Sequence, residues 1–232
     1  MMNIQSIAIS FLGAALSAPL GYPPDLSKYR DFRFGDSLAV IAKLVHLKPS
    51  EAKTIHQRPA LIQELTWQRT TLPQGDPVKN MVFSFYRDAL YRVVITYDAE
   101  RTEGLTVEDI IEAISKQYGT VTRPVAEITL TTTYLYNDGE KSISEQHEKV
   151  IARWEDARYS YNLFQPYPQS PFGMAIYEKA QQTQAEAAIV EALRLEEEEA
   201  PVRTLTRQKQ KEAEERLQQG KARQANKQPF RP

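Results

Sequence analysis

The chain has 232 residues, of which 41% are hydrophobic and 25% are charged, so it is long enough and apolar enough for one folded domain with extensions. Its 29 basic and 30 acidic residues give a formal net charge of -1, so no overall basic excess indicates a nucleic-acid partner. The sequence contains no cysteine, which excludes disulfides, thiolate metal sites and a cysteine nucleophile.

The first residues have the pattern of a secretory signal peptide. No charged side chain precedes Asp25, an apolar run covers residues 7–16, and Ala15 and Ser17 are small residues at the spacing that a signal peptidase reads. We expect residues 1–17 to be cleaved off and the mature protein to be exported, either to the periplasm or by secretion. The segment has no Lys or Arg, so a cytoplasmic protein with an apolar N-terminus is the alternative. Spanning a bilayer takes about 20 apolar residues, and no later stretch is that long, so no transmembrane segment is expected.

Two short helices are predicted next. The run "FGDSLAVIAKLVHL" predicts a helix over residues 37–47, because its apolar residues fall on one face and Asp36 or Ser37 can cap it. The run "PSEAKTIHQRP" predicts a second helix that begins at Pro49 and ends at Pro59.

Residues 37–57 also fit a helix-turn-helix whose second helix presents Lys53 and Arg58 to DNA. Against this motif, His46 stands where its turn normally carries Gly, and Pro59 leaves the second helix short. A helix hairpin packed on a sheet explains the same apolar pattern, so both interpretations stay open.

Alternation of apolar and polar residues with a period of two predicts the strands, as in "NMVFSFY" and "LYRVVITY". The short segment Arg87-Asp88-Ala89 between these two runs predicts a tight hairpin. The predicted strands cover residues 61–67, 80–86, 90–97, 125–133, 149–156, 158–164 and 172–178.

The clearest helix signal is "TVEDIIEAISKQYG", which predicts a helix over residues 107–118. Thr106 can cap its N-terminus, Glu108 and Asp109 lie in the first turn where the helix dipole favours anions, and Gly119 supplies a left-handed stop.

Together these elements predict an α+β fold: an antiparallel sheet with helices on one face, followed by a long C-terminal helix. The segments "YRDALYRVVI" (86–95) and "WEDARYSYNL" (154–163) echo each other, which suggests two pseudo-repeated units of one helix and three strands, with true duplication left open. We expect an α+β domain over residues 18–178, an amphipathic helix over 179–200, and a charged tail over 201–232 that is helical or disordered. The residues expected in the core are Leu38, Ile41, Val45, Trp67, Phe83, Phe85, Val93, Ile95, Ile110, Ile111, Ile114, Trp154, Leu163, Met174 and Ile176.

The phrases "KPSEAKTIHQRPALIQEL", "FSFYRDALYRVVITYD", "TEGLTVEDIIEAISKQYGT" and "ARWEDARYSYNL" resemble a family of exported bacterial proteins to which no activity is attached. The order of "FGDSLAVIAKLV", a hairpin with Phe-x-Phe and Leu-Tyr-Arg-Val, and a helix ending in Tyr-Gly is similar to the outer-membrane assembly lipoproteins of SmpA/OmlA type. Those proteins share a β-lactamase-inhibitor-like module, which implies a binding scaffold. This chain lacks the lipidated cysteine, so membrane anchoring does not carry over.

No motif indicates catalysis: the sequence has no G-x-S-x-G, no Walker A loop and no G-x-G-x-x-G. The adjacent acids Glu155 and Asp156 would point to opposite faces of a strand and are typical of a hairpin turn. The three histidines, His46, His56 and His147, are not spaced as metal ligands on one helix turn. We therefore expect no enzymatic activity, no cofactor and no metal site.

Tyrosines at alternate strand positions are candidate partner-binding residues, because tyrosine combines apolar area with a hydrogen-bonding tip. These residues are Tyr91, Tyr97, Tyr159 and Tyr161. The alternative is that they pack under the helices with their hydroxyl groups at the rim of the core.

The tail from Pro201 to Pro232 has nine basic and three acidic residues, a net charge of +6. Arg203, Arg207, Lys209 and Lys211 are its first candidate contacts to an anionic surface or an acidic partner, and a solvated spacer is the alternative. We expect a non-enzymatic, exported binding or scaffold module whose partner is another macromolecule of the cell envelope, a protein or an anionic surface. The alternative is a cytoplasmic DNA-binding protein that uses the helix-turn-helix at residues 37–57.

Overall fold

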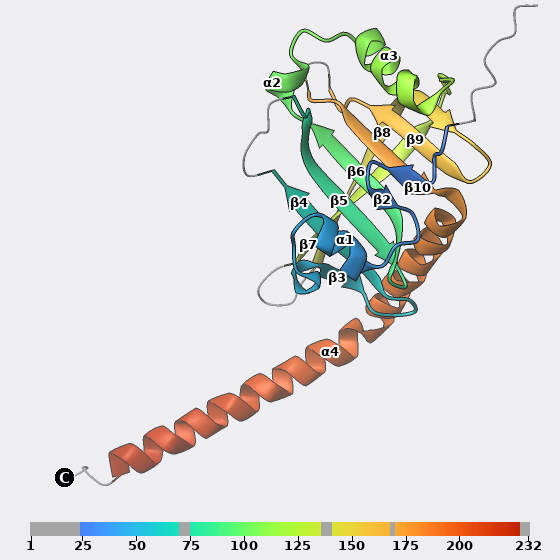
Figure 1. Ribbon diagram of the computed structural model, residues 1–232. Helices are drawn as coiled ribbons and strands as arrows, with labels where there is room; N and C mark the ends of the chain where they lie inside the picture. The colour runs from blue at the N-terminus through green and yellow to red at the C-terminus, as the bar shows by residue number, and fades with distance from the viewer. Residues whose placement is uncertain (1–23, 70–74, 136–140, 168–169, 228–232) are drawn as a thin grey trace, which may run out of the picture.

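Eight antiparallel strands form one sheet, in the order β3-β4-β5-β6-β10-β9-β8-β7 (Figure 1). The computed structural model describes residues 24–69, 75–135, 141–167 and 170–227, so the signal peptide predicted at residues 1–17 lies outside the described residues. The sheet strands are β3 (Lys53–His56), β4 (Ile62–Gln68), β5 (Val78–Tyr86), β6 (Ala89–Tyr97), β7 (Glu127–Leu135), β8 (Lys141–Glu155), β9 (Tyr159–Phe164) and β10 (Gly173–Glu178). The other elements are the small hairpin β1 (Lys28–Tyr29) and β2 (Phe32–Arg33), α1 (Leu38–Leu44), the 3-10 turn η1 (Pro49–Glu51), α2 (Ala99–Thr102), α3 (Val107–Tyr118) and α4 (Lys179–Lys227).

The strand order shows that the sheet consists of two four-stranded meanders, β3 to β6 and β7 to β10, joined at their last strands. Each meander follows helical segments, α1 with η1 in the first half and α2 with α3 in the second. The α+β fold and the antiparallel sheet are therefore confirmed, and each repeated unit has four strands where three were predicted.

The two echoed sequence segments do not occupy equivalent places in these units. The first, residues 86–95, spans the hairpin of β5 and β6, which are the third and fourth strands of its meander. The second, residues 154–163, spans β8 and β9, which are the second and third strands of the other. The echo thus reflects two hairpins built under the same rules. In the first of them Arg87 and Asp88 both have positive φ angles, 51° and 67°, as the tightest hairpin turns require.

The predicted helix-turn-helix is wrong, because the proposed recognition helix is a single 3-10 turn followed by strand β3. Lys53 and Thr54 pair with β4, and Ile55 is buried in a cluster that includes Ala185 and Ala188 of α4. The apolar spacing between Ala52 and Ile55 suits a helix, but pairing with β4 and packing against α4 favour the extended form. The segment that the DNA-binding interpretation requires as its recognition helix is therefore a 3-10 turn and a strand.

Helix α3 begins and ends where the sequence predicts. Thr106 is its N-cap, and its hydroxyl accepts a hydrogen bond from the backbone N–H of Asp109 while the Asp109 carboxylate accepts one from the N–H of Thr106. This reciprocal arrangement satisfies two backbone donors at the helix start. Gly119 follows the last turn with a φ angle of 81°, a conformation that glycine adopts without strain.

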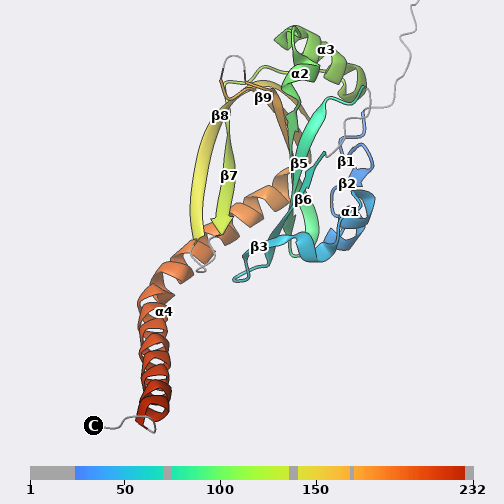
Figure 2. The ribbon, with the colours of Figure 1, turned by 90° about the vertical axis from the view of Figure 1, so that its left-hand side faces the viewer.

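The main core lies between one face of the sheet and a layer made by the N-terminal hairpin, α1 and α3 (Figures 1 and 2). Of the fifteen residues expected in the core, thirteen are buried, and Trp67 and Ile114 are partly buried against the same cluster. Trp154 is fully buried and its indole N–H donates to Ser115 Oγ at 3.0 Å, so it ties β8 to α3.

Helix α4 covers part of the opposite face and then leaves the domain. Its first turns pack Ala185 and Ala188 against Ile62, Tyr86 and other residues of the sheet. The helix continues without a break to Lys227, changes direction as it leaves the sheet, and contains Pro201, a common cause of such a bend (Figure 2). The part of the predicted tail that the structure describes is therefore helical.

A cluster of charged groups fastens the N-terminal hairpin to the sheet. Both oxygens of Asp76 accept hydrogen bonds from Arg30, at 2.8 and 3.0 Å, and Asp76 also pairs with the buried Arg69. The backbone N–H of Val78 donates to the same carboxylate at 3.0 Å. The hydrogen bonds from Arg30 are the main reason that the pKa of Asp76 falls from 3.8 to about 2.

We predict that Ile111→Ala lowers the free energy of unfolding by about 2–5 kcal/mol, because it leaves a cavity under α3 where Ile111 is 7% exposed. Chemical denaturation checks this value. Glu112→Ala is the matched control on the exposed side of the same helix, and its surface ion pair with Lys116 is worth about 0.5 kcal/mol. Equal effects of the two substitutions would contradict the placement of α3 on the core.

We predict that Asp76→Asn lowers the free energy of unfolding at neutral pH by roughly 2 kcal/mol, the linkage value of a carboxyl pKa moved from 3.8 to about 2. The lowered pKa means that the stabilisation is present above 3.8 and is lost as the pH falls through about 2, so the two proteins should converge in acid. Denaturation midpoints across this pH range test the prediction, with the exposed Asp31→Asn as control. A gap between the two proteins that stays constant down to pH 2 would contradict it.

Candidate functional site

The face of the sheet that turns away from α3 carries a continuous polar row. Cross-strand pairing connects its members through seven strands, from β3 to β8. In spatial order the row is Lys53, Glu64, Ser84, Arg92, Tyr177, Ser160 and Glu155. Three members near the middle of the row, Ser84, Arg92 and Ser160, are buried. Buried polar residues on a sheet face are uncommon, so this face is the candidate site.

A cavity of about 370 Å³ lies on this face. It is lined by residues of the central strands, of the edge strand β7 and of the first turns of α4. Its basic lining residues are Arg92, Arg153 and Lys179. Its acidic lining residues are Glu127, Glu155 and Glu186, so the formal charges balance. Which charges of the cavity are available to a ligand therefore depends on which of these residues pair with one another.

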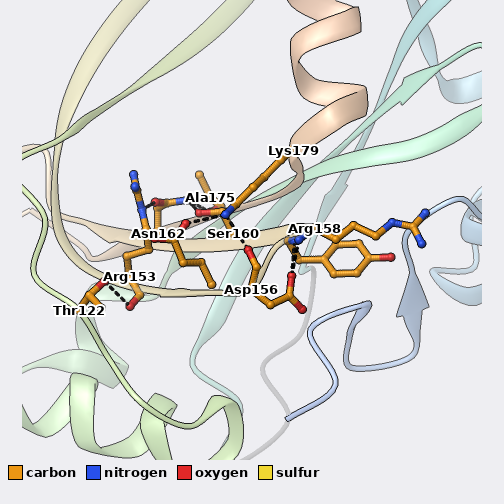
Figure 3. A network of polar contacts seen from close by, with 10 residues as sticks. Thr122, Arg153, Asp156, Arg158, Ser160, Asn162, Ala175 and Lys179 are labelled. Atoms are coloured by element: carbon orange, nitrogen blue, oxygen red, sulfur yellow. Dashed lines mark hydrogen bonds and ion pairs between the residues drawn. The ribbon is translucent and has the colours of Figure 1, made fainter. Parts of the chain in front are cut away.

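Hydrogen bonds fix one wall of the cavity (Figure 3). The Nε of Arg153 on β8 donates to Asn162 Oδ1 on β9 at 2.6 Å. The amide of Asn162 in turn donates to Ser160 Oγ at 3.0 Å and to the carbonyl of Ala175 on β10 at 3.3 Å. Asn162 and Ser160 are buried, so this network holds the base of the Arg153 side chain in place.

The acids at the neighbouring hairpin are engaged in structural contacts. Lys179 Nζ donates to Glu155 Oε2 and to the carbonyl of Asp156, both at 2.7 Å. The carboxylate of Asp156 accepts hydrogen bonds from the backbone N–H groups of Arg158 and Tyr159 (Figure 3). Glu155 and Asp156 thus hold the turn and the start of α4, as the hairpin interpretation expects.

Arg92 sits at the centre of the row and is 8% exposed. Its Nε has no hydrogen-bond partner, and it forms no ion pair, among the described residues. Glu64 stands two strands away in the row, and burial raises the pKa of its carboxyl although the charge of Arg92 lowers it.

The four tyrosines predicted to bind a partner are all buried in the structure, with exposed fractions from 0% for Tyr161 to 8% for Tyr97. Tyr97, Tyr159 and Tyr161 belong to the main core, as the packing alternative expects. Tyr91 lies on the opposite face, because a bulge in β6 places both Leu90 and Arg92 opposite consecutive residues of β5. The tyrosines therefore form no exposed recognition surface.

The C-terminal part of α4, residues 201–227, is the second candidate surface, and we call it the arm. The structure places the predicted contacts Arg203, Arg207, Lys209 and Lys211 on it, and every residue of the arm whose burial is described is exposed. Residues 1–200 hold 20 basic and 27 acidic residues, so a body of net charge -7 carries the positively charged tail.

No group of His, Asp and Glu side chains among the described residues has an arrangement that could hold a metal ion. None of the described helices is long and apolar enough to cross a membrane. Comparison with protein-family models, with curated proteins and with solved structures gives no match. The two resemblances drawn from the sequence therefore stay predictions.

Sequence reasoning missed the cavity residues Arg92, Arg153 and Lys179. A charged residue inside the apolar run "LYRVVITY" was a signal that one face of this strand meets something polar. Which residues face Arg92 depends on the pairing of β6 with β10, and strand pairing between distant segments is not visible in the sequence.

Proposed function

We propose that the protein is a non-enzymatic binding module, exported to the bacterial cell envelope, that contacts an anionic membrane surface through its arm. The observation that carries the proposal is that every residue of 201–227 whose burial is described is exposed. At a rise of about 1.5 Å per residue, the arm reaches about 40 Å. A helix of this length whose described side chains are exposed is suited to contact another body.

The charge of the arm favours an anionic surface. Eight basic and three acidic residues lie between Pro201 and Lys227, whereas apolar side chains are sparse. Val202, Leu205 and Leu217 are its exposed large hydrophobic residues, and they form no continuous stripe. The contact should therefore be electrostatic and reversible, with each basic residue near an anionic lipid surface contributing about 1 kcal/mol.

We predict that the triple variant Arg207→Glu, Lys209→Glu, Lys211→Glu binds anionic vesicles on the order of a hundredfold more weakly than the unaltered protein. Co-sedimentation with phosphatidylcholine vesicles, with and without phosphatidylglycerol, measures this at low and moderate salt. The matched control is Gln208→Ala with Gln210→Ala, which changes the same two turns without changing charge. The body should keep its unfolding midpoint in all variants, because the arm is exposed.

Removal of residues 201–232 is the second test of this proposal. When cells are fractionated at moderate salt, the truncated protein should no longer be found in the envelope fraction. If it keeps both its location and its vesicle affinity, the arm is a spacer and the proposal is wrong. If the full-length protein fails to bind vesicles and instead binds an acidic protein that the truncated protein does not bind, the membrane surface is the wrong partner.

Export is tested separately. We predict that the protein purified from its native host begins at Ala18, because Ala15 and Ser17 form the expected cleavage signal. N-terminal sequencing gives the answer directly. An intact Met1 on protein from the soluble cytoplasm would contradict both export and an envelope partner.

A further inference from the structure

Arg92 is a buried guanidinium whose hydrogen-bonding capacity the described residues do not use. It is 8% exposed, and its Nε, which is shielded from solvent, has no partner among the described residues. Arginine stays charged inside proteins, so a shielded N–H donor of this group without an acceptor is unfavourable. Buried polar groups in this condition are normally completed by water, an ion or a ligand.

The surroundings of Arg92 are those of a polar binding site. The cavity of about 370 Å³ has room for about twelve water-sized groups of roughly 30 Å³ each. Ser160 and Tyr177 lie in the same cross-strand row, and Gln182 of α4 faces the same space. The Oε1 of Gln182 is also buried and has no hydrogen-bond partner in the part of the chain that the structure describes. The orientation of this amide is fixed because its Nε2 donates to Glu186 Oε1 at 2.7 Å.

Apart from the pair of Lys179 with Glu155, the charged residues of the cavity form no ion pairs with described residues. Of these, Arg92 is buried and Arg153 is half-buried, whereas the carboxylates of Glu127 and Glu186 are on exposed residues. Glu155 is neutralised by Lys179 at 2.7 Å, whereas Arg153 forms no ion pair among the described residues and is held by Asn162. Burial raises the pKa of Glu64 and the charge of Arg92 lowers it, and the two residues form no ion pair with each other. The guanidinium groups of Arg92 and Arg153 therefore come from adjacent rows of the sheet, and neither forms an ion pair with a carboxylate of the described residues.

We propose that this cavity binds a small oxyanion, a carboxylate or a phosphate, whose oxygens accept hydrogen bonds from Arg92 and Arg153. Guanidinium groups match the geometry of both anions, and hydrogen bonds between charged partners are the strong ones. The remainder of the ligand is polar, because Ser160, Tyr177 and Gln182 complete the wall of the cavity. The volume of about 370 Å³ suits a ligand about the size of a dicarboxylic acid or a sugar phosphate. The site is independent of the arm and of export.

The full-length protein is titrated with succinate, with inorganic phosphate and with the neutral isostere succinamide. The Nε–Hε resonance of Arg92 in proton–nitrogen correlation spectra should shift with succinate or phosphate and stay in place with succinamide. The anion that saturates the shift at the lower concentration identifies the carboxylate or the phosphate as the preferred chemistry.

Arg92→Met is the decisive variant, because methionine keeps much of the volume and removes the charge. It should weaken anion binding on the order of tenfold or more. Its thermal unfolding midpoint should stay the same or rise, since a buried charge without partners is lost. Arg101→Met, on the exposed surface of α2, is the matched control and should bind as the unaltered protein does.

If Arg92→Met fails to fold, Arg153→Gln supplies the same test from the neighbouring row. The proposal is overturned if neither anion moves the Arg92 resonance. It is equally overturned if Arg92→Met binds both anions with unchanged affinity, or if succinamide binds as tightly as succinate.

Discussion

The antiparallel pairing of β6 with β10 is the contact on which the rest of the structure depends. It joins the two meanders into one sheet, with register pairs from Gly173 opposite Thr96 to Tyr177 opposite Arg92. On the other side of β10 the Phe164 ring lies over Gly173: a Cβ atom on Gly173 would lie 2.3 Å from this ring, so a larger residue would require the ring to move. A shift of one residue in register would turn the core side chains of β10 to the wrong face.

This central pairing also explains why a polar site occurs in the middle of the sheet. The α3 side of the sheet is packed with large apolar residues, and the other side is covered by α4 only in part. Where Ala185 and Ala188 approach the sheet, the opposing residues are apolar; beyond them the polar row begins. The bulge at Tyr91 marks this boundary, because it sets Tyr91 in the apolar cluster under α4 and brings Arg92 to the same face beside it.

Local signals in the sequence predicted the elements whose structure is decided locally. The cap at Thr106, the stop at Gly119 and the alternation of β5 were sufficient for α3 and for the hairpin of β5 and β6. The prediction for β8 was too short, because it began at residue 149 whereas the strand begins at Lys141. The segment around Ile55 was misassigned, because its extended form is fixed by β4 and by α4, which are distant in sequence. The tyrosines were assigned to the right strands, but which face Tyr91 occupies depends on one bulged residue that periodicity does not reveal.

The separation of charge between body and arm constrains how the arm can act. The turn of α4 just before the arm is held against the domain, where Arg58 near β3 donates to Glu199 at 2.9 Å and His56 contacts Glu196 at 3.3 Å. These acidic residues lie beside the domain, so the positive charge beyond Pro201 begins only as the helix moves away from it. Screening at physiological ionic strength has a length of about 8 Å, against an arm of about 40 Å. Most of the arm therefore lies outside the field of the negatively charged body and presents its own charge to whatever surface it meets, whereas at low ionic strength the body would compete for it.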